Sequence, residues 1–194
     1  PDDITGNFAF DRRFAASFIA FDPPDCLSIL IIFGGTLAQI GVLQGVFKPK
    51  SLVLEDPVSY FPDKQTPLDM LAWDEDNLPH DIEGLISMNP KWSRLDAAWK
   101  LLSLEQVDFD DARSAFAGNA PWDLRDSAID LMKITPTIWV LPEDSRFVSV
   151  DDKKKLEQDL GTDAIYVIPN VGHSIHRDDT ELFVEIVEKI SEGS

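Results

Sequence analysis

The sequence predicts an α/β fold with a mostly parallel sheet flanked by helices, and two observations carry this prediction. First, an apolar stretch at 27–32 precedes a glycine pair, a helical pattern at 36–47 and a second apolar stretch at 51–54. Continuous apolar runs of this length are typical of strands buried on both faces, and the order strand, helix, strand implies a parallel sheet. Second, alternating strand and helix patterns return after residue 135.

Composition limits the class of protein. The chain has 194 residues, of which 44% are hydrophobic, so it is long enough for one domain with a real core. Its net charge is −18, which disfavours nucleic acid or an anionic membrane as partner. No apolar run reaches the ~18 residues of a membrane helix. A single cysteine, Cys26, forms no intramolecular disulfide and agrees with a reducing, cytoplasmic location.

Between residues 11 and 134 the sequence predicts more helices than strands. Four phenylalanines at helical spacing predict a helix at 11–21, which a proline pair ends. Little strand signal follows between residues 58 and 134, and four of the five tryptophans lie there. Most of these aromatic side chains are expected to pack together, with one or two facing a cleft. The expected helices of this part are 67–76, 80–88, 91–104, 110–117 and 122–133.

The last sixty residues restore the strand and helix alternation. Strands are expected at 137–141 and 164–168, with a helix at 150–160 between them. Ser149 is a suitable N-cap for that helix and Gly161 a suitable stop. A final helix starts near Thr180. We therefore expect a core made of 1–57 and 135–194, with a helical cap at 58–134.

Four segments in this order resemble the C-terminal portion of the α/β-hydrolase fold family. They are the strand–Gly-Gly–helix unit at 29–38, the strand at 52–57, the loop at 141–148 and the Gly-His loop at 171–178. The resemblance implies a mostly parallel sheet, a helical lid and a serine–acid–histidine triad in that chain order. It also implies that N-terminal strands of the family are missing before Pro1. The strand at 27–32 would then lie at a sheet edge, where self-association is expected.

The resemblance places the catalytic histidine at His173. The family histidine takes the proton of the serine hydroxyl during attack. Outside the family, a loop histidine more simply caps backbone groups. His176 is expected to pack or hydrogen-bond beneath the loop, and His80 to lie on the surface.

The position of the acid is less sharply defined. The usual family position falls on Ser145, and a shift of one residue would let Asp144 orient the histidine. Asp144 is therefore the favoured acid. Glu143 remains an alternative, as do Glu55 and Asp56, which follow the preceding strand. Each of these carboxylates could instead be a solvated loop residue or a helix cap.

The nucleophile position departs from the family pattern. Aligning Gly34 and Gly35 with the end of the family's turn puts Ile32 where the serine belongs. Isoleucine has no proton to lose and no lone pair, so it cannot attack a carbonyl. Ser28 lies too early in the strand, and Thr36 lies within the following helix. The sequence offers no replacement nucleophile at this turn.

These observations predict a protein related to hydrolases that cleave ester or lactone bonds in small apolar substrates. The substrate would lie in a cleft under the cap, and the resemblance implies neither a metal nor an organic cofactor. Because Ile32 replaces the serine, we expect activity to be lost or impaired. Two alternatives stay open: a non-catalytic relative that binds a small molecule or a protein, and a truncated inactive product.

Overall fold

The computed structural model of the chain describes residues 27–31 and 33–192. Its main sheet has four strands in the order β1 (Leu27–Ile31), β2 (Ser51–Glu55), β5 (Thr137–Pro142) and β6 (Ile165–Ile168). All three pairings between them are parallel, which confirms the predicted sheet. The helix expected at 11–21 lies outside the described residues.

The apolar pattern of the strands explains why the sheet is covered on both faces. All five residues of β2 are buried, and neighbouring side chains point to opposite faces. Leu52 and Leu54 pack into one apolar cluster together with Trp139 and Leu141 of β5. Val53 belongs to a second cluster on the other face.

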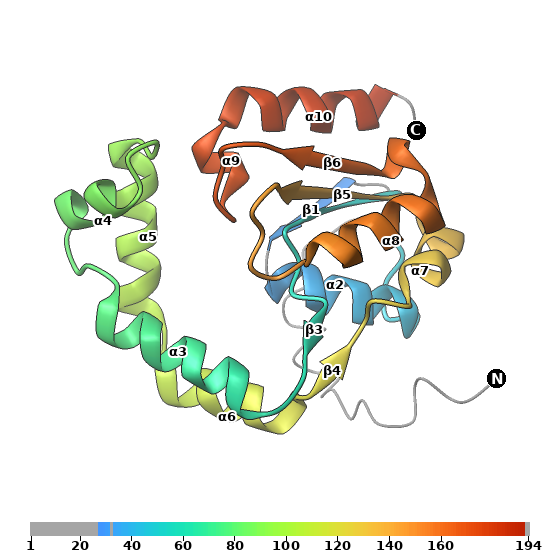
Figure 1. Cartoon of the computed structure of the whole chain (residues 1–194). Coiled ribbons are helices and arrows are strands. Elements are labelled where there is room, and N and C mark those ends of the chain that lie inside the picture. The colour runs from blue at the N-terminus through green and yellow to red at the C-terminus, as the bar shows by residue number, and fades with distance from the viewer. Residues whose placement is uncertain (1–26, 32, 193–194) are drawn as a thin grey trace.

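Helices cover each face, as Figure 1 shows. The first cluster is completed by α2 (Phe33–Leu43), α7 (Ala128–Ile134) and α8 (Val150–Leu160). The second is completed by α9 (Ile175–Asp178) and α10 (Thr180–Glu192). Ser149 caps α8 by accepting a hydrogen bond from the Asp152 backbone N–H, and the helix ends at Gly161 with φ 85°, as predicted.

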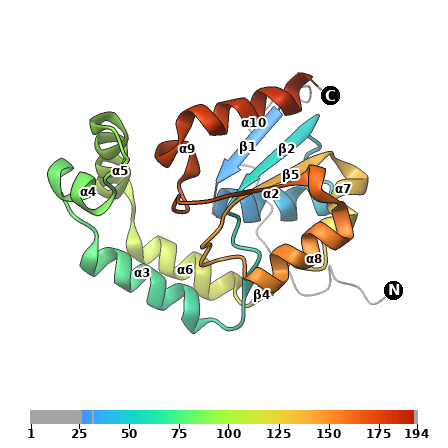
Figure 2. The ribbon, with the colours of Figure 1, turned by 45° about the horizontal axis from the view of Figure 1, so that its top comes forward.

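Four further helices form an arm beside the carboxyl ends of the strands (Figures 1 and 2). They are α3 (Gln65–Asn77), α4 (Ile82–Met88), α5 (Arg94–Gln106) and α6 (Phe109–Asn119). The sequence predicted each of them to within a few residues. We call this arm of residues 65–119 the lid. The exact boundaries of core and cap remain a prediction.

The base of the lid differs from the prediction. A helix was expected over 122–133, but Trp122–Asp123 forms the short strand β4, antiparallel to β3 (Tyr60–Phe61), and helix α7 begins only at Ala128. The expected helix was wrong in its first six residues, because the side chain of Trp122 is buried instead. Its indole packs in a third apolar cluster with Phe61, and its Nε1 donates to the Val58 carbonyl at 3.0 Å.

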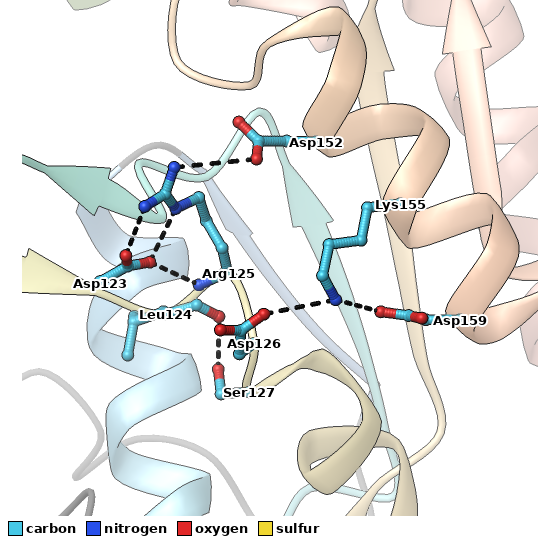
Figure 3. Close-up of polar contacts among 8 residues, drawn as sticks. All are labelled: Asp123, Leu124, Arg125, Asp126, Ser127, Asp152, Lys155 and Asp159. Atoms are coloured by element: carbon cyan, nitrogen blue, oxygen red, sulfur yellow. Dashed lines mark hydrogen bonds and ion pairs between the residues drawn. The ribbon is translucent and has the colours of Figure 1, made fainter.

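A polar network joins the segment after β4 to helix α8 (Figure 3). Arg125 binds the Asp123 carboxylate at 2.5 Å and approaches Asp152 at 4.0 Å. Lys155 lies between Asp126 at 3.3 Å and Asp159 at 2.5 Å. Exposed ion pairs of this kind each contribute only up to about 1 kcal/mol to stability.

Candidate functional site

A cleft of about 950 Å³ lies between the lid and the carboxyl ends of the strands. In parallel sheets this is the usual place for a binding or catalytic site. Core and lid both contribute to its walls. The lining residues are Gly34, Thr66, Asp69, Met70, Trp73, Asp74, Leu78, Leu85, Met88, Asn89, Trp92, Lys100, Ser103, Arg146, Phe147, His173, Ser174, His176 and Arg177.

The nucleophile position of the family lies, in chain order, between the first strand and the helix that follows it. Strand β1 ends at Ile31 and helix α2 begins at Phe33. Gly34, in the first turn of α2, lines the cleft. Ile32 stands between the two elements and lies outside the described residues, so its expected role stays a prediction.

His173 lines the cleft from the loop that follows β6. Its ring meets the ring of Phe147 edge-on, with centroids 6.2 Å apart. Burial, together with the nearby charges of Arg146, Lys100 and Arg177, lowers the pKa of His173 to about 4. The imidazole is therefore neutral at pH 7. Within residues 27–31 and 33–192, neither ring nitrogen has a hydrogen-bond partner.

Asp144 is exposed at the surface of the loop after β5. Its charge acts on Lys153, and in the described part of the chain no hydrogen bond joins it to His173. The assignment of Asp144 as the acid therefore remains a prediction. Glu143, the neighbouring alternative, is exposed as well.

Ser145, at the usual family position of the acid, binds Asp56 instead. Its hydroxyl donates to Asp56 Oδ1 at 2.5 Å and accepts from the backbone N–H groups of Phe147 and Val148. Asp56 is fully buried, and its φ of 39° places it in the left-handed region. Burial raises the pKa of Asp56 to about 6. Among the described residues its Oδ2 has no hydrogen-bond partner.

Glu55, the last residue of β2, pairs with the second histidine of the loop. The fully buried carboxylate accepts from the His176 backbone N–H at 3.0 Å and contacts His176 Nδ1 at 2.9 and 3.0 Å. His176 was expected to hydrogen-bond beneath the loop, and this contact confirms that expectation. His80 is exposed, also as expected.

Asp178 is a site residue to which the sequence analysis gave no role. Its Oδ1 accepts from the indole Nε1 of Trp92 at 3.0 Å, and its Oδ2 accepts from the Gly172 backbone N–H at 2.6 Å. It also lies near enough to His173 to raise the pKa of that imidazole slightly against the stronger opposing effects. One carboxylate therefore connects the lid to the loop that carries His173.

The sequence analysis also did not predict which cationic side chains line the cleft. Arg146 and Arg177 belong to the two loop segments that resemble the family, but a sequence pattern does not give the direction of a side chain. Lys100 lies half-buried on lid helix α5, and no sequence motif distinguishes it from the other lysines. In the described chain, no three His, Cys, Asp or Glu side chains form a group that could hold a metal ion. No described helix has the length and apolar character needed to span a membrane.

Comparison with known proteins finds similarity at the level of structure. Neither a family model nor a curated protein matches the sequence. Among solved structures, the chain is similar to an E-2-(acetamidomethylene)succinate hydrolase, with 17% identity, a TM-score of 0.65 and coverage of 99% of this chain and 76% of that one. It is similar to a meta-cleavage product hydrolase from Pseudomonas fluorescens IP01, with 14% identity, a TM-score of 0.62 and coverage of 97% and 75%.

A third similar structure is described by its fold. It is an alpha/beta hydrolase enzyme from a Medee basin deep-sea metagenome library, with 15% identity, a TM-score of 0.60 and coverage of 92% of this chain and 69% of that one. At such low identity the likeness concerns the fold alone. Together with the parallel sheet and the helices on both faces, it shows that the chain has the α/β-hydrolase fold, as the sequence predicted.

Proposed function

We propose that the cleft binds a small, largely apolar molecule of the ester or lactone class, and that the chain cleaves it slowly or not at all. One observation carries this proposal. Ile32 is the single residue between β1 and α2, immediately before the turn of α2 that lines the cleft. At that position a hydrolase of this fold needs a serine hydroxyl.

The lining of the cleft supports an apolar ligand. Its walls carry six large apolar or aromatic side chains from the lid and one from the core. They are Met70, Trp73, Leu78, Leu85, Met88, Trp92 and Phe147. Ligand sites are commonly concave and apolar with a few polar groups, and a volume of about 950 Å³ suits a small molecule.

The chemistry of the cleft supports the loss of turnover. In a serine hydrolase, the serine oxygen forms a bond to the carbonyl carbon while its proton passes to the histidine, and water later releases the acyl group. His173 is a neutral imidazole in the cleft, but an isoleucine side chain offers it no proton to accept. Loss of a triad nucleophile typically removes several orders of magnitude of rate.

The similar structures support hydrolase ancestry. Their names describe hydrolysis of E-2-(acetamidomethylene)succinate and of a meta-cleavage product. We carry over to this chain only the reaction class. The ester or lactone bond is our choice within that class, because it is the bond that a neutral imidazole and a serine hydroxyl most readily cleave.

A second candidate is a non-catalytic relative that binds a protein. Leu95, Trp99 and Leu102 lie exposed on helix α5, at a spacing that places them on one face. Exposed apolar faces of this kind often mark interaction sites. We rank this candidate second because the cleft offers a more enclosed site.

The test replaces the side chain at the nucleophile position. We expect Ile32→Ser to hydrolyse 4-nitrophenyl acetate about tenfold or more faster than the unmodified chain, since it restores a hydroxyl. Ile32→Ala is the matched control, because it removes the same bulk without adding a hydroxyl, and it should not gain activity. His173→Ala in the Ile32→Ser background should remove the gain. Equal rates for all variants would contradict the proposal.

A further inference from the structure

Three cationic side chains converge on the cleft of a strongly acidic protein. Lys100 comes from lid helix α5, Arg146 from the loop after β5, and Arg177 from α9. All three line the cleft, and all three lie close enough to His173 to act on its charge state. The chain as a whole has a net charge of −18, so this concentration of positive charge is a local reversal.

Among the described residues, these cations make no direct salt bridge, although Asp74 lies near enough to interact electrostatically with Lys100 and Arg146. Within the part of the chain that the structure describes, none of the three forms a salt bridge or donates a hydrogen bond from its charged end. The other three described arginines behave differently. Arg94 binds Glu83, Arg113 binds Glu75 and Arg125 binds Asp123, each at 2.6 Å or less. Among the described arginines, the two that form no salt bridge with a carboxylate are therefore those of the cleft.

Aromatic side chains support the two guanidinium groups. Arg177 lies over the ring of Trp92, 4.7 Å from its centroid, and Trp92 is buried. Arg146 lies 5.5 Å from the centroid of the Phe147 ring. A guanidinium that rests on a ring keeps its N–H groups available at its edge, which suits recognition of a planar anion.

The acidic residues of the cleft do not offset this charge completely. Asp69 and Asp74 also line it. The Asp69 carboxylate already accepts a hydrogen bond from the side chain of Gln65 at 2.6 Å. Burial raises the pKa of Asp74, while the nearby charges of Lys100 and Arg146 oppose that rise. Burial likewise lowers the pKa of Lys100. Asp178, beside the cleft, is held by Trp92 and Gly172.

We propose that the cleft is specific for small molecules carrying a carboxylate at one end, which Lys100, Arg146 and Arg177 bind beside His173. The apolar body of the ligand lies against the aromatic and aliphatic walls. A planar carboxylate suits the site better than a tetrahedral phosphate monoester, because a guanidinium group that rests on a ring presents its N–H groups in one plane at its edge. The inference rests on the proposed function of the cleft as a small-molecule site.

The test measures binding and needs no turnover. Isothermal titration calorimetry compares 4-phenylbutanoate, its uncharged amide 4-phenylbutanamide, and 3-phenylpropyl phosphate at pH 7. We expect the carboxylate to bind about tenfold more tightly than the amide, since charged hydrogen bonds contribute more than neutral ones. The phosphate should bind more weakly than the carboxylate, and added salt should weaken carboxylate binding.

Single substitutions test which cationic side chains bind the carboxylate. Lys100→Met and Arg146→Met should each weaken carboxylate binding about threefold to tenfold and weaken amide binding much less. Arg94→Met is the matched control, because it removes one positive charge from the same helix as Lys100 but outside the cleft lining. It should alter neither affinity. Circular dichroism confirms that each variant is folded.

The outcomes separate this inference from the proposed function. Equal affinity for carboxylate and amide, or tighter binding of the phosphate, overturns the carboxylate specificity and leaves the cleft as a binding site. Loss of carboxylate affinity in Arg94→Met to the same degree as in Arg146→Met also overturns the proposal. The preference for the carboxylate would then come from the electrostatic field of the whole protein and not from the cations of the cleft. If none of the probes binds, the cleft itself fails as a ligand site.

Discussion

Glu55 and His176 form a pair that ties the carboxyl end of β2 to the first turn of α9. One carboxylate oxygen, Glu55 Oε1, accepts from the His176 backbone N–H and contacts the ring Nδ1 at 2.9 Å. The carboxylate is fully buried, so both contacts form in surroundings of low polarity. His173 lies three residues earlier in the same loop. The pair therefore fixes the position of the loop that carries His173 into the cleft.

We predict that Glu55→Ala lowers the free energy of unfolding by about 2–3 kcal/mol, because it leaves two donors of His176 unpaired and opens a cavity. Urea unfolding followed by circular dichroism measures this change. Glu157→Ala on helix α8 is the control, since Glu157 is exposed and such changes usually stay within about 0.5 kcal/mol. Similar losses in the two variants would show that the pair does not hold the loop.

A second prediction concerns the pH dependence of stability. Burial raises the pKa of Asp56 from 3.8 to about 6 in the folded protein. The folded state therefore binds more protons than the unfolded state between these values, so the contribution of Asp56 to stability falls as the pH rises from 4 to 6. Asp56→Asn should stabilise the protein at pH 7 by on the order of 2 kcal/mol and change it little at pH 4.

Urea unfolding at pH 4 and pH 7 measures the effect of Asp56→Asn on stability. Asn keeps an oxygen that can accept from the Ser145 hydroxyl, and it tolerates the left-handed φ of 39°. Asp151→Asn is the control at an exposed carboxylate and should have little effect at either pH. Destabilisation by Asp56→Asn at pH 7 would show that the buried carboxylate is favourable where it lies.

The third prediction is that His173 stays neutral well below neutral pH. Burial, aided by Arg146 and Lys100, lowers its pKa from 6.5 to about 4. The stability linked to this group is therefore complete above pH 6.5 and is lost as the pH falls toward 4. In an NMR titration, the imidazole signals assigned by their loss in His173→Asn should move with a midpoint near pH 4. A midpoint near 6.5 would mean that the ring is solvated and distant from the cations.

The fourth prediction tests the contact between lid and loop. Trp92→Phe removes the indole donor to Asp178 and should lower the free energy of unfolding by about 1–2 kcal/mol. Trp99→Phe is the matched control, because Trp99 is 59% exposed on helix α5 and has no role in the cleft. Thermal unfolding of the two variants compares them directly. An equal effect of both changes would contradict a specific role for the Trp92 hydrogen bond.

The strands and most helices could be read from the sequence because their signals are local. The apolar run of β2 predicts burial on both faces, and Ser149 and Gly161 mark the ends of α8. Strand β4 could not be read in this way. It has two residues and exists only through pairing with β3, about sixty residues earlier, while the sequence around it has helical periodicity.

The candidate site was predictable only where one segment carries the signal. The Gly-His loop points to His173 because the histidine and its neighbours lie together in the chain. The partner of His176 lies 121 residues away, so no local pattern could join the two. The direction of Lys100 and Arg146 into the cleft depends on how lid and core meet, and this is a tertiary property.

The most direct test of the account compares the unmodified chain with His173→Ala in hydrolysis of 4-nitrophenyl acetate and 4-nitrophenyl butyrate. The account holds that an isoleucine at position 32 leaves the imidazole of His173 with no nucleophile to activate. It therefore predicts that the two proteins give the same rate within about twofold at pH 7. A measurable rate in the unmodified chain that His173→Ala abolishes would contradict it, because some other group would then be acting as the nucleophile.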